Sequence, residues 1–187
     1  MMSQSIALSA QLTYIRVRGL YGHFIQAARR HQLPAPLLLA VASRESNMGL
    51  ALEADWTGDH GNGIGIMQID RRYHPEFTSA HPNDDHRANI DYGAQFLAGL
   101  VERFDGKLSP SLAAYNAGEA RVRMALTLGS HPDKVTTGGN YSADVLQRAR
   151  QIESLLRASN AARMISYLVP AGLIGLFTYH LLTPKTT

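Results

Sequence analysis

Apolar residues recur at steps of three and four along most of the chain, the spacing that places them on one face of a helix. The pattern predicts helices over about 15–31, 36–48, 88–104, 110–117, 119–128 and 142–158. In the second of these, Pro36 fits the first helical turn and Gly49 is placed to end the helix.

The pattern changes between residues 55 and 70, where four glycines occur among strand-forming isoleucines. Asn62 and Gly63 together predict a tight turn between two strands. We therefore expect a small β-hairpin or sheet near 55–70 within a mainly α protein of the α+β class. The punctuation of 128–141 by glycine and proline predicts a loop.

The segment 164–182 contains no Asp, Glu, Lys or Arg. As a helix it would measure roughly 28 Å, close to the hydrocarbon thickness of a bilayer. It predicts a single-pass transmembrane helix, with a buried terminal helix as the alternative. The expected organisation is a domain over 1–160 and a C-terminal segment over 161–187. No secretory signal is recognisable at the N-terminus, and arginines before the apolar segment favour a cytoplasmic domain.

Composition narrows the possible chemistry. The chain has no cysteine, which excludes disulfides, a thiol nucleophile and cysteine-ligated metals. The spacing of its eight histidines matches no common ligand pattern, so neither a metal nor a cofactor is expected. A net charge of +3 suits an anionic polymer but is too small to indicate nucleic acid.

Three carboxylates are candidates for chemistry. Glu45 emerges from the edge of an apolar helix, where loss of water would raise its pKa and suit a general acid for glycosidic cleavage. Asp59 and Asp70 lie on the glycine-rich segment, where they can line a cleft and act on water. Taken singly, each also fits an ordinary role: a paired surface glutamate, or turn and cap residues.

Four blocks in order resemble the goose-type lysozymes and, more loosely, the lytic transglycosylases. They are ASRES at 42–46, GDHGNGIGIMQID at 58–70, AYNAG at 114–118 and YSADV at 141–145. The resemblance implies a mostly helical lysozyme-like domain with a small sheet. Secreted animal members often carry disulfides, so the missing cysteines indicate a bacterial or phage setting.

The resemblance also implies roles for individual residues. Glu45 matches the family's general acid, and Asp59 and Asp70 match the aspartates that position the hydrolytic water. The positions that match substrate-binding residues or lie among them are His60, Met67, Gln68, Tyr115, Asn116 and Tyr141.

The expected function is that of a muramidase, which cleaves the β-1,4 bond between N-acetylmuramic acid and N-acetylglucosamine with inversion. The alternatives are a lytic transglycosylase with 1,6-anhydromuramoyl products and a catalytically silent, membrane-tethered glycan-binding module. The expected partners are peptidoglycan strands and a lipid membrane through 164–182, without nucleic acid or an obligate protein partner. A phage lysin or virion component would reconcile a cytoplasmic domain with a cell-wall substrate.

Overall fold

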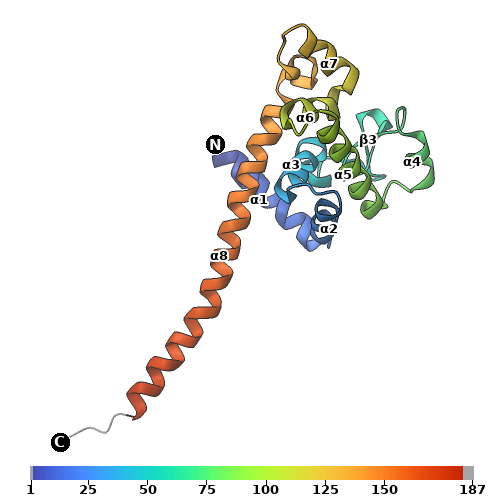
Figure 1. Cartoon of the computed structure of the whole chain (residues 1–187). Helices are drawn as coiled ribbons and strands as arrows, with labels where there is room; N and C mark the ends of the chain where they lie inside the picture. Colours follow the sequence, from blue (N-terminus) through green and yellow to red (C-terminus); the bar gives the residue numbers. More distant parts are fainter. Residues whose placement is uncertain (1, 183–187) are drawn as a thin grey trace, which may run out of the picture. The chain divides into compact units, whose positions relative to one another are not determined.

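The computed structural model describes the backbone of residues 2–182 and the side chains of residues 4–161. The chain divides into two compact units, Met1–Ile152 and Glu153–Thr187. The helices are α1 (Met2–Val17), α2 (Tyr21–Arg30), α3 (Ala35–Ser46), α4 (Pro75–Ala80), α5 (His86–Arg103), α6 (Leu108–Ala117), α7 (Glu119–Thr127) and α8 (Tyr141–Leu182) (Figure 1). Only α8 continues from the first unit into the second.

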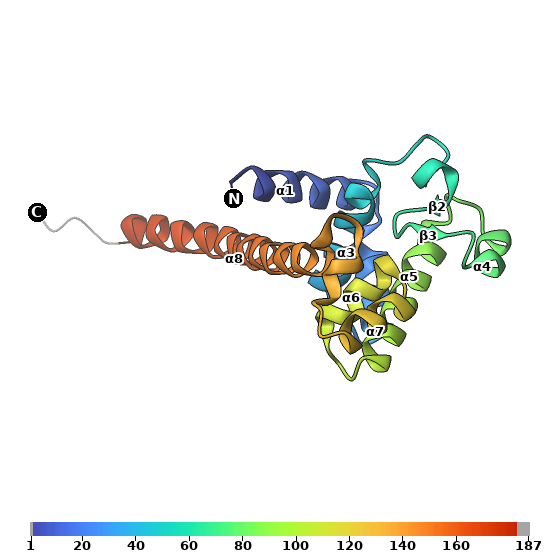
Figure 2. The same cartoon turned by 90° about the horizontal axis from the view of Figure 1, so that it is seen from above.

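A small antiparallel sheet and several short 3-10 turns complete the first unit. The strands β1 (Thr57–Gly58), β2 (Gly63–Ile64) and β3 (Ile69–Asp70) pair in that order. The 3-10 turns are η1 (Asn47–Gly49), η2 (Asp59–Gly61), η3 (Pro132–Val135) and η4 (Thr137–Gly139). Both views place α4 beside β3 at one edge of the unit (Figures 1 and 2).

Helix α3 is buried on all sides along most of its length, because its sequence from Leu37 to Ala42 is uninterrupted apolar residues. Its C-terminal cap Asn47 takes the left-handed conformation, with φ 51°, and so ends the helix. The hydroxyl of Ser46 donates to the carbonyl of Ile66 over 2.7 Å. The end of α3 is thereby tied to the glycine-rich segment.

A buried asparagine on α5 holds the glycine-rich segment from the other side. The Asn89 amide donates to the carbonyl of Ile64 over 2.9 Å and accepts from the Met67 amide over 2.8 Å. Gly65, with φ +67°, lies against this amide, and a Cβ there would meet Asn89 Cγ at 2.5 Å. Only glycine satisfies both the backbone conformation and the close approach.

The structure confirms the mainly helical α+β class and the small sheet near 55–70. The expected helices over 36–48, 88–104, 110–117 and 119–128 correspond to α3, α5, α6 and α7. The expected loop over 128–141 contains the two 3-10 turns η3 and η4.

Two local predictions were wrong. The single helix over 15–31 is broken between α1 and α2, because Gly19 takes a left-handed φ of +74°. The turn at Asn62 and Gly63 is displaced, because Gly63 belongs to β2 and pairs with Gly58. The connection is η2 instead, where Asp59 and His60 adopt positive φ.

The transmembrane helix predicted over 164–182 lies outside the residues whose side chains are described. Within the part of the chain that was described, no helix is both long enough and apolar enough to cross a membrane. The membrane anchor therefore gains no support from the structure, and the division into 1–160 and 161–187 stays a prediction.

Replacing Gly65 by alanine is expected to lower the free energy of unfolding by about 2–4 kcal/mol. The methyl group would displace the buried Asn89 amide and would also strain the left-handed backbone. Gly61→Ala is the matched control, because Gly61 also has a positive φ (+85°) but nothing lies within 4 Å of its Cβ position. Its loss should stay near 1 kcal/mol. Urea denaturation of both variants measures the difference, and equal losses would refute the steric role of Asn89.

Candidate active site

Glu45 lies in the last turn of α3 and is only partly exposed. Loss of water around its carboxyl group raises its pKa from an ordinary 4.5 to about 7. The Tyr141 hydroxyl donates a hydrogen bond to Glu45 Oε1, and Arg44 lies nearby. Both neighbours favour the charged form and lower the pKa, but burial outweighs them. A large fraction of Glu45 is therefore protonated at neutral pH.

Tyr141 is the first residue of α8 and is 2% exposed. The residues that follow it are held by the buried carboxylate of Asp133. This carboxylate accepts hydrogen bonds from the backbone amides of Ser142 over 2.7 Å and Ala143 over 3.1 Å. These amides have no partner within the helix, so Asp133 acts as a cap from outside it. The hydroxyl of Thr136 also accepts from the Tyr141 amide, over 3.3 Å. The start of α8 is thus held in place beside Glu45.

A polar network joins the side of α3 next to Glu45 to the first turns of α8. Asp144 forms ion pairs with Arg44 at 3.2 Å and with Arg148 at 2.8 Å. Arg148 also donates to the buried Ser43 hydroxyl over 2.9 Å. That hydroxyl in turn donates to Gln11 of α1 over 2.6 Å. The network therefore connects helices α1, α3 and α8 through residues next to Glu45 in α3.

The two candidate aspartates are brought together by an arginine. Arg72 donates to both oxygens of Asp70, with Nη2 and Oδ2 at 2.5 Å, and reaches Asp59 Oδ2 at 3.1 Å. The hydrogen bonds from Arg72 lower the pKa of Asp70. Asp70 is therefore ionised at neutral pH, while the Asp59 side chain is 59% exposed.

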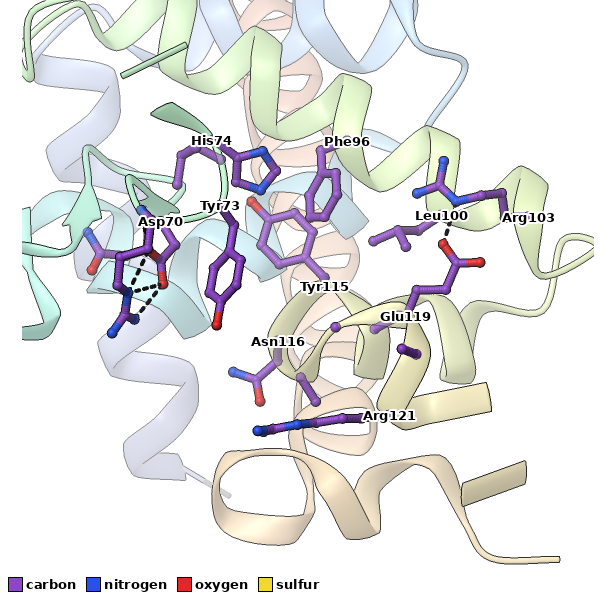
Figure 3. Close-up of a pocket in the computed structure, with 17 residues that line it drawn as sticks. Asp70, Tyr73, His74, Phe96, Leu100, Arg103, Tyr115, Asn116, Glu119 and Arg121 are labelled. Atoms are coloured by element: carbon purple, nitrogen blue, oxygen red, sulfur yellow. Dashed lines mark hydrogen bonds and ion pairs between the residues drawn. The ribbon is translucent and has the colours of Figure 1, made fainter. Parts of the chain in front are cut away.

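A pocket of about 620 Å³ opens between the sheet and helices α5, α6 and α7. Four of the candidate residues line it, namely Gln68, Asp70, Tyr115 and Asn116. Further side chains on its walls include Tyr73, His74, Phe96, Arg103, Glu119 and Arg121 (Figure 3).

Tyr115 connects this pocket to the candidate acid. Its hydroxyl donates to the carbonyl of Met67 over 2.9 Å, and its ring lines the pocket. Burial and the nearby charge of Glu45 raise the pKa of Tyr115. Glu45, Tyr141 and Asp59 are not among the residues that line the pocket, so Tyr115 is the lining side chain that relates the pocket to Glu45.

The remaining candidates differ in their surroundings. The Met67 side chain is fully buried against Gly93 and does not line the pocket, so its link to the site is the carbonyl bound by Tyr115. His60 is exposed on η2 and also lies outside the pocket lining. The Gln68 side chain is fixed by donating to the carbonyl of Gly65 over 2.8 Å.

Asn116 is held by its side-chain oxygen, which accepts from the Thr137 amide over 2.8 Å. Its amide nitrogen is the group left to donate into the pocket. On the opposite wall, His74 Nδ1 lies 2.9 Å from the Tyr92 hydroxyl. Burial lowers the pKa of His74, which favours its neutral form.

Arg72 was not predicted from the sequence, and neither His74 nor Arg121 was assigned to the site. The signal for Arg72 was present, because an arginine two residues after Asp70 can turn back onto its carboxylate. The contact with Asp59 was not visible in the sequence, since it depends on the pairing of β2 with β1 and β3.

A profile of the Lysozyme g family matches residues 10–154. The chain belongs to this family, as the four sequence blocks indicated. Lysozyme g of Gallus gallus is 33% identical over 123 residues, which cover 61% of this chain and 54% of that protein. Lysozyme g of Takifugu rubripes is 32% identical over 140 residues, which cover 69% and 71%. The chain thus spans about half the length of the chicken protein.

The fold has a counterpart among solved structures. An inactive mutant of the lytic transglycosylase Slt from Pseudomonas aeruginosa matches with a TM-score of 0.55 and 23% identity. The match covers 72% of this chain and 24% of that one. At this identity the likeness concerns the fold, which is the lysozyme-like arrangement expected from the sequence.

Glu45→Gln is expected to raise the free energy of unfolding at pH 8 by roughly 1–3 kcal/mol. Between pH 4.5 and about 7 the unfolded wild type loses a proton that the folded protein retains, so its stability falls as the pH rises. At pH 4 both states are protonated and the two proteins should be about equally stable. Urea denaturation at several pH values measures this, with exposed Glu53→Gln as the control. Parallel curves for Glu45→Gln and wild type would refute the raised pKa.

Proposed function

We propose that the protein is a muramidase that cleaves the β-1,4 bond between N-acetylmuramic acid and N-acetylglucosamine in peptidoglycan. The observation that carries the proposal is the placement of Glu45 at the end of the buried helix α3, hydrogen-bonded by Tyr141, in the unit whose open pocket is lined by Asp70, Tyr115 and Asn116. Burial there raises the pKa of the Glu45 carboxyl group to about 7. Membership of the Lysozyme g family and the named activity of the relatives support the same substrate.

Glu45 is the general acid in this proposal and gives its proton to the leaving glycosidic oxygen. As the proton leaves, negative charge appears on the Glu45 carboxylate. The hydrogen bond from Tyr141 and the charge of Arg44 both favour that ionised form. Their stabilisation therefore increases during the step, which is the condition for lowering its barrier.

The second half of the reaction is assigned to the aspartates. Asp70 lines the pocket and is ionised, so its charge can stabilise the positive charge that develops on the sugar and can orient a water molecule. Asp59 shares Arg72 with Asp70 and adds a second carboxylate at the exposed end. Attack by that water on the anomeric carbon, opposite the leaving group and with its proton passing to Asp70, would invert the anomeric centre.

Lytic transglycosylation is the second candidate, and one observation favours it. Arg72 occupies both oxygens of Asp70 and lowers its pKa, which makes this carboxylate a weak base. A transglycosylase needs no water, because the 6-hydroxyl of the muramoyl residue closes an anhydro ring. We place hydrolysis first because the chain retains both aspartates.

Glu45→Gln should lower the rate of cleavage of bacterial cell walls by about 10²–10⁴-fold, since the amide cannot act as a general acid. Binding to insoluble peptidoglycan should remain, because all the residues that line the pocket are unchanged. Release of soluble fragments and a pull-down assay measure the two effects, with Glu53→Gln again as the control. Undiminished cleavage by Glu45→Gln would remove the assignment of the acid.

Mass spectrometry of the released fragments should detect reducing muramic acid ends, which are heavier by one water than anhydro ends. Asp70→Asn should slow their formation, because it removes the charge that faces the pocket. Products that carry only 1,6-anhydromuramoyl ends would contradict hydrolysis and establish the second candidate.

A further inference from the structure

The charged side chains of the pocket are nearly all paired. The five charged residues that line it are Asp70, Arg72, Arg103, Glu119 and Arg121. Arg72 and Asp70 approach to 2.5 Å, and Arg103 and Glu119 approach to 2.7 Å. Arg121 forms no ion pair and no side-chain hydrogen bond with any residue whose side chain is described. It therefore gives this end of the pocket an uncompensated positive charge.

The charged residues of α7 differ in whether they have an ion-pair partner. Glu119 is held by Arg103 and by Arg123, at 2.7 Å in each case. Arg123 also donates to the carbonyl of Arg103 over 2.8 Å and does not line the pocket. Arg121 is exposed and lines the pocket together with Asn116, and in Figure 3 its side chain extends toward that of Asn116.

Arg121 and Asn116 can therefore act on one ligand. The guanidinium offers several N–H donors in a plane, a geometry that matches a carboxylate. The oxygen of Asn116 is already bound by Thr137, so its remaining groups are N–H donors as well. Two donor groups that line the same pocket, one of them charged, favour an anionic group over the hydroxyl and acetamido groups of a neutral sugar.

We propose that Arg121 forms an anion subsite that binds a carboxylate of a muramoyl residue, on its lactyl group or on the attached peptide. This inference rests on the proposed function and specifies which part of peptidoglycan the site distinguishes. N-acetylglucosamine carries no charge, so the carboxylate is the feature that separates a peptidoglycan strand from a neutral oligomer of N-acetylglucosamine. Arg121 is thus a specificity residue, separate from the proton transfer at Glu45.

The test compares binding of three ligands to full-length protein carrying Glu45→Gln, so that cleavage does not interfere. The ligands are soluble peptidoglycan strands with their peptides, the same strands after an amidase has removed the peptides, and oligomers of N-acetylglucosamine. Dissociation constants are measured by calorimetry with and without Arg121→Ala. Arg121→Lys keeps the charge, and Arg123→Ala is the control on the same helix.

Arg121→Ala is expected to weaken binding of a carboxylate-bearing strand by about 5- to 20-fold and to leave the neutral oligomers unchanged. Weakening confined to strands with peptides assigns a peptide carboxylate. Weakening confined to the stripped strands assigns the lactyl carboxylate, which is free only after the amidase has cleaved its amide bond to the peptide, and weakening of both kinds of strand means that the subsite accepts either carboxylate. The effect should shrink at high salt, and Arg121→Lys should restore part of it. Equal weakening of binding for all three ligands, or unchanged binding of all three, would overturn the proposed subsite. If the Glu45→Gln protein bound no glycan at all, the proposed function would fail together with it.

Discussion

The burial of α3 determines how the candidate site is built. A helix that is enclosed on all sides has no solvated face for a charged side chain. The carboxyl group of the first acidic residue after its apolar run is therefore partly desolvated. That residue is Glu45, whose pKa rises to about 7 in consequence. The surrounding elements compensate for this position. Tyr141 supplies a hydrogen bond, and Arg44 is kept in place by Asp144.

The surroundings of Glu45 and of Asp70 shift the pKa values of the two carboxyl groups in opposite directions. Around Glu45, burial favours the protonated carboxyl group and raises its pKa to about 7. Around Asp70, hydrogen bonds from Arg72 stabilise the ionised form. Two carboxylates with pKa values driven apart by their environments are what acid-assisted glycoside cleavage requires. The same fold achieves both because one carboxylate ends a buried helix and the other ends an edge strand.

The parts of this arrangement that depend on local sequence were predictable. The apolar run before Glu45 indicated its desolvation, and the glycines near 58–65 indicated a small sheet. The parts that depend on tertiary contacts were not. The helical pattern continues through Gly19, so the break that its backbone conformation creates could not be read from periodicity. Met67 was expected among substrate contacts, but a sequence block does not reveal which residues of the turn between β2 and β3 face the core. The Met67 side chain packs there against Gly93 of α5.

The capping of α8 by Asp133 has a consequence for the order in which the site forms during synthesis. Glu45 and its hydrogen-bond partner Tyr141 are 96 residues apart in the chain. A nascent chain therefore exposes the whole of α3 long before the tyrosine leaves the ribosome. The carboxylate of Asp133, which binds the two backbone amides that follow Tyr141, is made just before the tyrosine and so is equally late in synthesis. A chain interrupted before this point carries Glu45 without the hydroxyl that favours its ionised form. In the proposed mechanism, such a partly made copy would lack the group that stabilises the conjugate base of the acid.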